Sequence, residues 1–212
     1  MSRVLNLPQG EQGPIPQAIQ RRYFDKLVHR EGVGDDGSCF FHSLACLLNF
    51  SNYSSQTTNN RVRLGHNLRK LLRAKITPVT WFDFWKRSGI HADVVPDVRT
   101  IRNRMKKVTE WADVYMISWI MDHLNLSLYF FDTTNNRVYC GIRRADNSRL
   151  SGGSETGTGF ILWLNHAHFE PIGMPSDGRL RFLFPQDHPT VLQVDQSYKD
   201  EGCADVTLKH II

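Results

Sequence analysis

The sequence predicts a domain of the α+β class. From residue 19 to residue 125, apolar side chains recur at spacings of three and four, which is typical of helices with one buried face. Beyond that point apolar and polar residues alternate, which is typical of strands. A length of 212 residues suits one domain with a sizeable core, and 41% hydrophobic with 22% charged residues is an ordinary globular composition.

The predicted helices differ in how clearly their buried faces stand out. Segment 61–76 is the clearest, because leucines line one side and arginines the other. The crowded aromatic stretch 78–98 has two readings, core anchors or a surface that grips a protein partner, and the sequence leaves both open. The polar run 51–60 is predicted to be a loop, and Asn125 is expected to end the last helix. The predicted helices cover 19–31, Cys39 to Leu48, 61–76, 98–109 and 111–124.

The two ends of the chain are predicted to lie outside the domain. Residues 1–18 carry prolines and glycines with few large apolar groups, so they are predicted to be a flexible lead-in. Residues 19–184 form the predicted domain, and residues 185–212 are a C-terminal extension without a clear pattern. The glycine-rich run 151–159 is predicted to be a mobile loop, because it lacks the lysine of a phosphate loop. The predicted strands cover 126–131, 137–142, 160–164, 168–172 and 179–184.

Charge and cysteine usage narrow the class of protein. The net charge is +5, and much of the excess lies in two basic clusters, which we interpret as solvated helix faces because no RNA-binding motif or zinc finger accompanies them. The four cysteines form no C-x-x-C pair, so a reducing, cytoplasmic location is expected and a zinc site or disulfide framework is not. No apolar run has the length of a membrane span, and the N-terminus does not resemble a secretory signal. The clusters are Arg61, Arg63, Arg69, Lys70, Arg73 and Lys75, and Arg99, Arg102, Arg104, Lys106 and Lys107.

One stretch has the chemistry of a nucleophile. Turn-forming residues from Gly34 to Ser38 lead into an apolar helical run, so Cys39 is predicted to lie where a loop becomes a helix. The unpaired N–H groups and the dipole of a helix start favour a thiolate, and these N–H groups can also hold the oxyanion formed when a thiolate attacks a carbonyl. Taken alone, a cysteine before an apolar helix is more often a small buried hydrophobe.

A cysteine nucleophile needs a base and a third group that orients the base. Two histidines, His166 and His168, lie beside a predicted strand. Glu170 follows His168 by two positions, so both face the same side of a strand and the carboxylate can accept a hydrogen bond from the ring. His166 shares that face, so spacing alone leaves both histidines open. His42 lies one turn from Cys39, and we expect it to point along the helix, away from the turn.

The run Asp36-Gly37-Ser38-Cys39 resembles the nucleophile motif of the OTU (ovarian tumour) family of cysteine proteases, which reads Asp-Gly-x-Cys before a helix. The run His168-Phe169-Glu170 resembles the family's histidine motif, although the family more often has Asp or Asn at the third place. Between the two, the segment from Trp111 to Phe130 is similar to the family's tryptophan-containing helix that feeds a strand. The three motifs occur in the family's order.

The resemblance implies a papain-like OTU fold with a small central, mostly antiparallel sheet flanked by helices. It implies Cys39 as the nucleophile, His168 as the base and Glu170 as the group that orients the base. Asp36 joins the catalytic residues because its loop is implied to supply the oxyanion hole, through backbone N–H groups of Asp36, Gly37 and Cys39.

The function implied by the resemblance is a deubiquitinase without metal or cofactor. Its partners would be ubiquitin and polyubiquitin chains, with a ubiquitin-like protein as an alternative substrate. The chain is expected to be a monomer that binds no membrane or nucleic acid and acts in the cytoplasm, that of the host if it comes from a virus or an intracellular pathogen. The alternatives are a catalytically weak protein that binds ubiquitin or a ubiquitin-like protein, and a basic nucleic-acid-binding domain.

Overall fold

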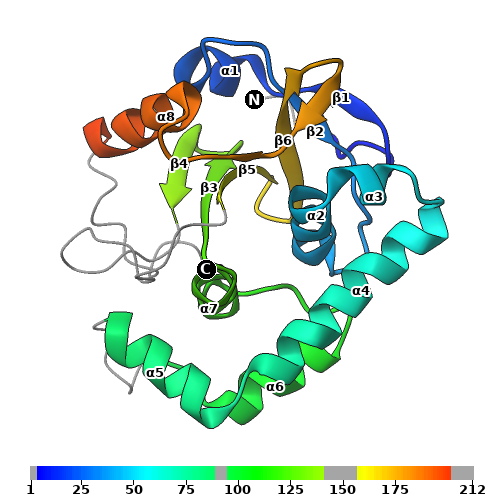
Figure 1. Cartoon of the computed structure of the whole chain (residues 1–212), viewed down its shortest axis with the longest axis vertical. Coiled ribbons are helices and arrows are strands. Elements are labelled where there is room, and N and C mark those ends of the chain that lie inside the picture. Colours follow the sequence, from blue (N-terminus) through cyan, green and yellow to red (C-terminus); the bar gives the residue numbers. More distant parts are fainter. Residues whose placement is uncertain (1–3, 89–94, 141–156, 202–212) are drawn as a thin grey trace.

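A computed structural model describes residues 4–88, 95–140 and 157–201 of the chain (Figure 1). The helices are α1 (Gln17–Tyr23), α2 (Cys39–Leu48), α3 (Phe50–Ser54), α4 (Thr58–Lys75), α5 (Pro78–Ser88), α6 (Val98–Lys106), α7 (Val114–Leu124) and α8 (Pro189–Asp200). The strands are β1 (Gln12–Pro14), β2 (His29–Glu31), β3 (Leu126–Asp132), β4 (Arg137–Cys140), β5 (Gly157–Leu164), β6 (His168–Ser176), β7 (Arg179–Arg181) and β8 (Leu183–Phe184).

The strands pair in the order β1-β2-β6-β5-β3-β4, with β7 beside β6 and β8 beside β5. Among these pairs only β3 and β5 run parallel. The β5–β6 pair is the hairpin that the sequence predicted, and its register sets Leu164 opposite His168 and Leu162 opposite Glu170. The prediction of a mostly antiparallel sheet is therefore confirmed.

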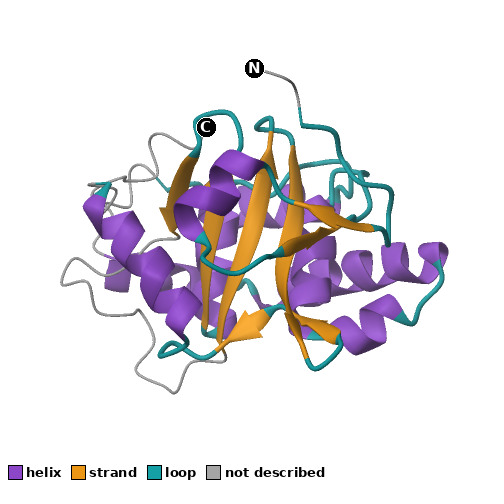
Figure 2. Ribbon diagram, turned by 90° about the horizontal axis from the view of Figure 1, so that it is seen from above, coloured by secondary structure: helices purple, strands orange, loops and turns teal. Residues whose placement is uncertain are grey.

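Helices cover both faces of the sheet, so the fold has three layers (Figures 1 and 2). The helices α1 and α8 pack on one face, and the group from α2 to α7 packs on the other. Each face of the sheet has its own hydrophobic core, and the side chains of β3 alternate between the two. Leu128 lies in the core formed with α2 to α7, whereas Phe131 lies in the core formed with α1 and α8. The predicted α+β class, with helices flanking the sheet, is confirmed.

The helices α7 and α2 differ in whether a side chain caps the helix start. The Asp113 carboxylate accepts the backbone N–H of Met116 at 2.8 Å and caps α7. Asn125 ends α7 in the left-handed conformation, with a φ of 55°, as the sequence predicted. Helix α2 is different, because the side chain of its N-cap residue, Ser38, makes no hydrogen bond to the helix. No capping side chain of Ser38 therefore competes for the N–H groups at the start of α2.

Several boundaries differ from the sequence predictions. The helix predicted over 19–31 is shorter: α1 ends at Tyr23, because residues 29–31 instead form β2, which pairs with β6. Leu27, between the two, is exposed. The predicted loop 51–60 contains most of α3 and the first turn of α4, which the side chains of Asn49 and Thr57 cap.

Both ends of the described chain carry regular structure. Strand β1 and the first residues of α1 lie within the stretch predicted to be a flexible lead-in, because β1 pairs with β2. Helix α8 occupies part of the stretch predicted to be a C-terminal extension. Most of the glycine-rich run 151–159 lies outside the described residues, and its last three residues begin β5.

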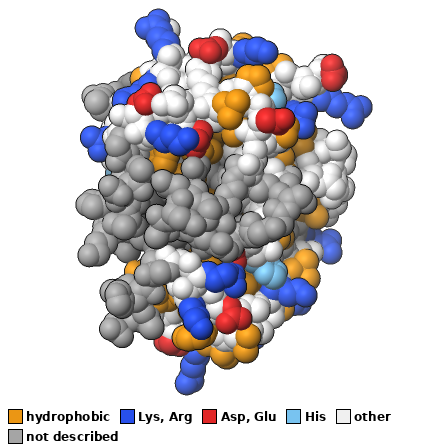
Figure 3. All heavy atoms as spheres, turned by 60° about the vertical axis from the view of Figure 1, so that its left-hand side comes forward, with side chains coloured by type: hydrophobic (Ala, Val, Ile, Leu, Met, Phe, Trp, Pro, Cys, Tyr) orange, Lys and Arg blue, Asp and Glu red, His pale blue; other side chains and the backbone are white. Residues whose placement is uncertain are grey.

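The surface shows no single field of charge on the face drawn in Figure 3, where basic side chains are interspersed with acidic and hydrophobic ones. Most members of the two basic clusters lie exposed on α4 and α6, in agreement with solvated helix faces. Arg69 is buried between these helices, so that interpretation is wrong for Arg69. The Arg61 side chain is also largely covered, with 13% exposed. Within the described ranges, none of the helices has both the length and the apolar character needed to cross a membrane.

Candidate active site

Cys39 is the first residue of α2, as the sequence predicted, and it lies against strand β6. The backbone of Phe169 lies close to the thiol and lowers its pKa. One turn later, the Ser43 hydroxyl donates to the backbone carbonyl of Phe169 at 3.0 Å, and the rings of Phe40 and Phe169 pack edge to face. These contacts fix the start of α2 beside the residue that follows His168.

The Cys39 thiol is buried, with 3% of the residue exposed. Burial raises the pKa of the thiol to about 11, and backbone hydrogen bonds from Phe169 and Phe40 lower it by less than burial raises it. The charges of Asp35 and Asp36 add to the increase. The sequence led us to expect that the helix start would favour a thiolate. In this structure the loss of water around the sulfur outweighs the helix start.

His168 and Glu170 lie on the same face of β6, and both side chains are buried. The Nδ1 atom of His168 is 3.5 Å from the Asp35 carboxylate, and its Nε2 atom is 3.6 Å from the Glu170 carboxylate. Neither ring nitrogen has a hydrogen-bond partner among the described residues. Burial lowers the pKa of His168, the charge of Asp35 opposes this, and His42 and Arg30 add to the decrease. Burial therefore favours the neutral form of the ring, which has an acidic group on each side.

The Glu170 carboxylate is held firmly by groups that sequence analysis did not single out. Its Oε2 atom accepts from Arg30 Nη1 at 2.8 Å, and its Oε1 atom accepts the backbone N–H of Leu7 at 2.7 Å. Burial raises the pKa of Glu170, while the charge of Arg30 and these hydrogen bonds lower it. Arg30 in turn donates to the carbonyls of Pro14 and Leu5. The predicted orienting group thus belongs to a buried ion pair that joins β2, β6 and the N-terminal segment.

His166, the other histidine that the spacing left open, lies in the turn before β6 with a φ of 58°. Its Nε2 atom is 3.0 Å from the buried carboxylate of Asp132, and its ring lies against Trp163. These contacts tie the turn after β3 to the turn after β5. The structure thus gives His166 a partner in these turns, whereas His168 precedes Phe169, the residue that contacts α2.

The Asp36 side chain faces the helices rather than the His168 ring. Its Oδ1 atom accepts from the Ser38 N–H and from His42 Nε2, both at 3.0 Å, and its Oδ2 atom is 2.7 Å from His66 Nε2. Burial alone would raise the pKa of Asp36, but the hydrogen bond and charge of His42, with the bonds from Ser38 and His66, lower it well below its usual range. Our expectation that His42 points away from the turn is wrong, because its ring reaches back to Asp36.

Two features of the loop before Cys39 concern the predicted oxyanion hole, namely the conformation of Gly37 and the backbone N–H groups. Gly37 has a φ of 80°, and a Cβ atom there would lie 2.5 Å from the carbonyl oxygen of Thr109, so only glycine fits without movement. The backbone N–H groups of Asp36, Gly37 and Cys39 donate to no acceptor among the described residues. Donors of this kind can stabilise an oxyanion at the thiol. The oxyanion hole itself stays a prediction.

Arg69 stabilises the loop before Cys39 through hydrogen bonds to Gly37 and Ser38. Its guanidinium donates to the Ser38 hydroxyl at 3.0 Å and to the carbonyl of Gly37 at 3.3 Å. Its other bonds go to a neighbouring segment that carries the exposed side chains of Val108 and Trp111. The carbonyls that accept those bonds belong to Arg104, Met105, Val108 and Glu110. Sequence reasoning missed Arg69 because an arginine within a basic helix resembles its exposed neighbours.

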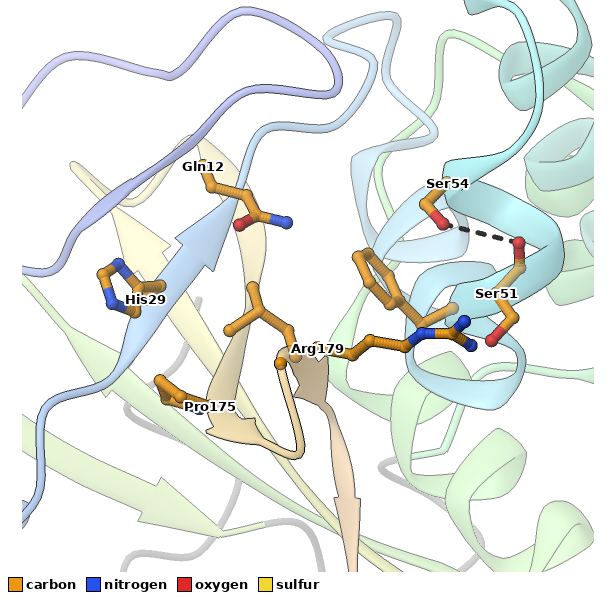
Figure 4. Close-up of a pocket in the computed structure, with 9 residues that line it drawn as sticks. Gln12, His29, Ser51, Ser54, Pro175 and Arg179 are labelled. Atoms are coloured by element: carbon orange, nitrogen blue, oxygen red, sulfur yellow. Dashed lines mark hydrogen bonds between the residues drawn. The ribbon is translucent and has the colours of Figure 1, made fainter.

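A separate hollow of about 690 Å³ lies away from Cys39 and His168 (Figure 4). It is bordered by β1 and β2, by the turn between β6 and β7, and by α3, with Arg179 and Ser51 on facing sides. None of the predicted site residues lines it. It is therefore distinct from the candidate active site.

The helices on both faces of a mixed sheet, with α2 packed against β6, are consistent with the papain-like α+β fold. Within that class the chain has the fold of an OTU domain. The structure of an ovarian tumour (OTU) domain in complex with ubiquitin matches it with a TM-score of 0.51 and 16% identity, covering 93% of this chain and 99% of that one. At this identity the similarity establishes the fold.

Two other OTU structures are also similar. The viral OTU domain protease from Taggert virus has a TM-score of 0.49 and 13% identity, covering 81% of this chain and 92% of that one. An OTU deubiquitinase from Wolbachia pipientis wMel has a TM-score of 0.42 and 19% identity, covering 71% of this chain and 90% of that one. The chain matches no protein-family model and no curated protein sequence.

Proposed function

We propose that the chain is a cysteine peptidase of the OTU type that releases ubiquitin from proteins or from ubiquitin chains. One observation carries this proposal: Cys39 begins α2, and its thiol lies against the backbone of Phe169, the neighbour of His168. The OTU domain structure of similar fold contains ubiquitin, which supports ubiquitin as the substrate. We also propose that the chain acts as a monomer in the cytoplasm, that of the host if its source is a virus or a pathogen.

In the first half of the reaction, His168 takes the proton of the Cys39 thiol and the sulfur attacks the carbonyl carbon of the bond between the ubiquitin C-terminus and a lysine amine. The backbone N–H groups around Gly37 hold the oxyanion. His168 then gives the proton to the leaving amine as the C–N bond breaks, which leaves a thioester on Cys39. The Glu170 carboxylate, 3.6 Å from the ring in the free protein, stabilises the imidazolium.

In the second half, His168 takes a proton from water and the resulting hydroxide attacks the thioester carbonyl. The C–S bond breaks, ubiquitin leaves with a free carboxylate, and His168 returns the proton to the sulfur. The mechanism uses only groups of the chain and water.

The test is cleavage of the full panel of di-ubiquitin linkage types by the purified chain, beside Cys39→Ala and Cys140→Ala. Cys140 lies on β4 and serves as the matched control. We expect cleavage that is lost in Cys39→Ala and kept in Cys140→Ala. Cleavage that survives in Cys39→Ala would refute the assigned nucleophile. If none of the three proteins cleaves di-ubiquitin, a ubiquitin-like protein becomes the next substrate to test.

One observation favours the alternative of a protein that binds ubiquitin with little or no catalysis. The thiol is buried, its pKa is raised to about 11, and His168 has no hydrogen-bond partner among the described residues. Titration with ubiquitin that carries a thiol-reactive C-terminal group separates the two. A peptidase forms a covalent adduct at Cys39, whereas a binder without catalytic function binds and stays unlabelled.

A further inference from the structure

Next to the candidate active site, three side chains from three separate elements gather at one point. Asp36 lies on the loop before α2, His42 lies on α2 and His66 lies on α4. One nitrogen or oxygen atom from each of them lies within 4.8 Å of the other two. We propose that Asp36, His42 and His66 bind a divalent transition-metal ion, with Zn²⁺ as its natural representative.

The chemistry of the three side chains fits this class of ion. Two imidazoles and a carboxylate suit the ions of intermediate softness from Fe²⁺ to Zn²⁺, whereas Mg²⁺ and Ca²⁺ prefer oxygen ligands alone. Zn²⁺ commonly takes three protein ligands and one water molecule. Tetrahedral bonds of 2.0–2.1 Å place ligand atoms about 3.3 Å apart. His42 Nε2 is now 3.0 Å from Asp36 Oδ1, and His66 Nε2 is 2.7 Å from Asp36 Oδ2. Because one ligand atom from each residue lies within 4.8 Å of the other two, the side chains need to shift by at most about 1.5 Å to reach this spacing.

The three side chains already lie together in the free protein, and two of them are held in place. The His42 ring is fully buried and lies against two glycines: a Cβ atom at Gly65 would lie 2.0 Å from its Nδ1 atom, and one at Gly34 would lie 3.0 Å from its Nε2 atom. Asp36 is fixed as well, because its Oδ1 atom accepts the Ser38 N–H. Ligands that are held in position before binding lose little freedom when the ion arrives, which favours affinity.

An ion can reach the cluster from solvent. About a third of the side chain of Asp36 and of His66 is exposed, at 32% and 31%, while His42 closes the inner side. Within the described part of the chain, this is the group of three His, Cys, Asp or Glu side chains whose atoms meet the spacing. Cys39 and His168 do not belong to it, and although Asp36 is also a predicted catalytic residue, binding of an ion by the three side chains does not require the peptidase function.

The experiment uses the Cys39→Ala chain as the parent, so that the thiol of the candidate active site cannot bind metal. We expect calorimetry to find one equivalent of Zn²⁺ bound. Co²⁺ should give visible ligand-field bands without the near-ultraviolet charge transfer of a sulfur ligand, because the donors are nitrogen and oxygen. The melting temperature should rise with Zn²⁺, since the folded state alone assembles the three ligands.

His66→Gln in this parent removes one ligand at a partly exposed position and keeps a side chain that can hydrogen-bond to Asp36. We expect it to weaken Zn²⁺ binding by at least about 100-fold and to abolish the rise in melting temperature. His29→Gln, on the distant strand β2, is the control and should match the parent. Asp36→Asn provides a second test should His66→Gln fold poorly, as judged by circular dichroism.

The proposal is overturned if His66→Gln and Asp36→Asn bind Zn²⁺ as tightly as the parent. It is also overturned if the Co²⁺ spectrum contains sulfur charge transfer, which would place the ion on a cysteine. Failure of the parent to bind Zn²⁺ at all would equally refute it. None of these readouts uses ubiquitin, so they are separate from the test of the proposed peptidase activity.

Discussion

Replacement of Glu170 by glutamine tests the buried ion pair behind His168. Glutamine keeps the shape of the side chain but removes its charge and replaces one oxygen with an NH₂ group. In the structure one carboxylate oxygen accepts from Arg30 at 2.8 Å and the other accepts from Leu7 at 2.7 Å. A single amide oxygen can serve one of these donors, so the NH₂ group must face the other donor.

The cost follows from the burial of both partners. Removing one member of a buried ion pair and leaving the other charged typically costs about 3–5 kcal/mol. Arg30 keeps its hydrogen bonds to the carbonyls of Pro14 and Leu5, so we expect the lower end, about 3 kcal/mol in the free energy of unfolding. For a chain of this length that loss lowers the melting temperature by about 6–12 °C.

The assay is urea unfolding followed by tryptophan fluorescence, with the wild-type chain and Glu110→Gln as references. Glu110 pairs with Lys107 on the surface, so its replacement should leave the unfolding midpoint unchanged. A loss below about 1 kcal/mol for Glu170→Gln would refute the reasoning, because it would show that the Arg30 charge does not depend on Glu170.

Three other predictions test the neighbourhood of Cys39. Because burial raises the pKa of this thiol to about 11, its alkylation by iodoacetamide should accelerate about tenfold per pH unit from pH 7 to 10. Mass spectrometry of the Cys39 peptide measures the rate, and a plateau below about pH 8 would contradict the shift. In Arg69→Lys, the three N–H donors of lysine replace a guanidinium that makes six hydrogen bonds, so the free energy of unfolding measured in urea should fall by about 2–3 kcal/mol. The exposed control Lys70→Arg should leave it unchanged, and an equal effect of both substitutions would argue against the Arg69 network. Gly37→Ala places a Cβ atom against Thr109 at a positive φ and should slow turnover of a ubiquitin substrate by at least about tenfold, and full activity would disprove the need for glycine.

Sequence patterns predicted the elements that local periodicity defines. The helix predicted over 61–76 is α4, the strand predicted over 126–131 is β3, and the hairpin that carries His168 and Glu170 has the expected partners. These features depend on neighbours within a few positions, and their spacing is readable in one sequence.

Features that depend on distant parts of the chain were not predicted. Arg30 and Arg69 are buried because carbonyls and carboxylates from remote segments accept their hydrogen bonds, which no local pattern reveals. His66 meets Asp36 only because α4 packs beside α2. The raised pKa of the Cys39 thiol has the same origin, since β6 and its neighbours exclude water from a position that the helix start alone would favour for a thiolate.

Hydrogen bonds between residues far apart in the sequence have a consequence for protein synthesis. The bond from Leu7 to Glu170 joins positions 163 apart, and the bond from Tyr23 to Glu201 joins positions 178 apart. A ribosome adds about 5–20 residues per second, so the stretch between Cys39 and His168 takes about 6–26 s to make. Throughout that interval the cysteine has been translated and its histidine has not. A nascent chain therefore carries a thiol without a base, and the site can assemble only after His168 and Glu170 have been translated.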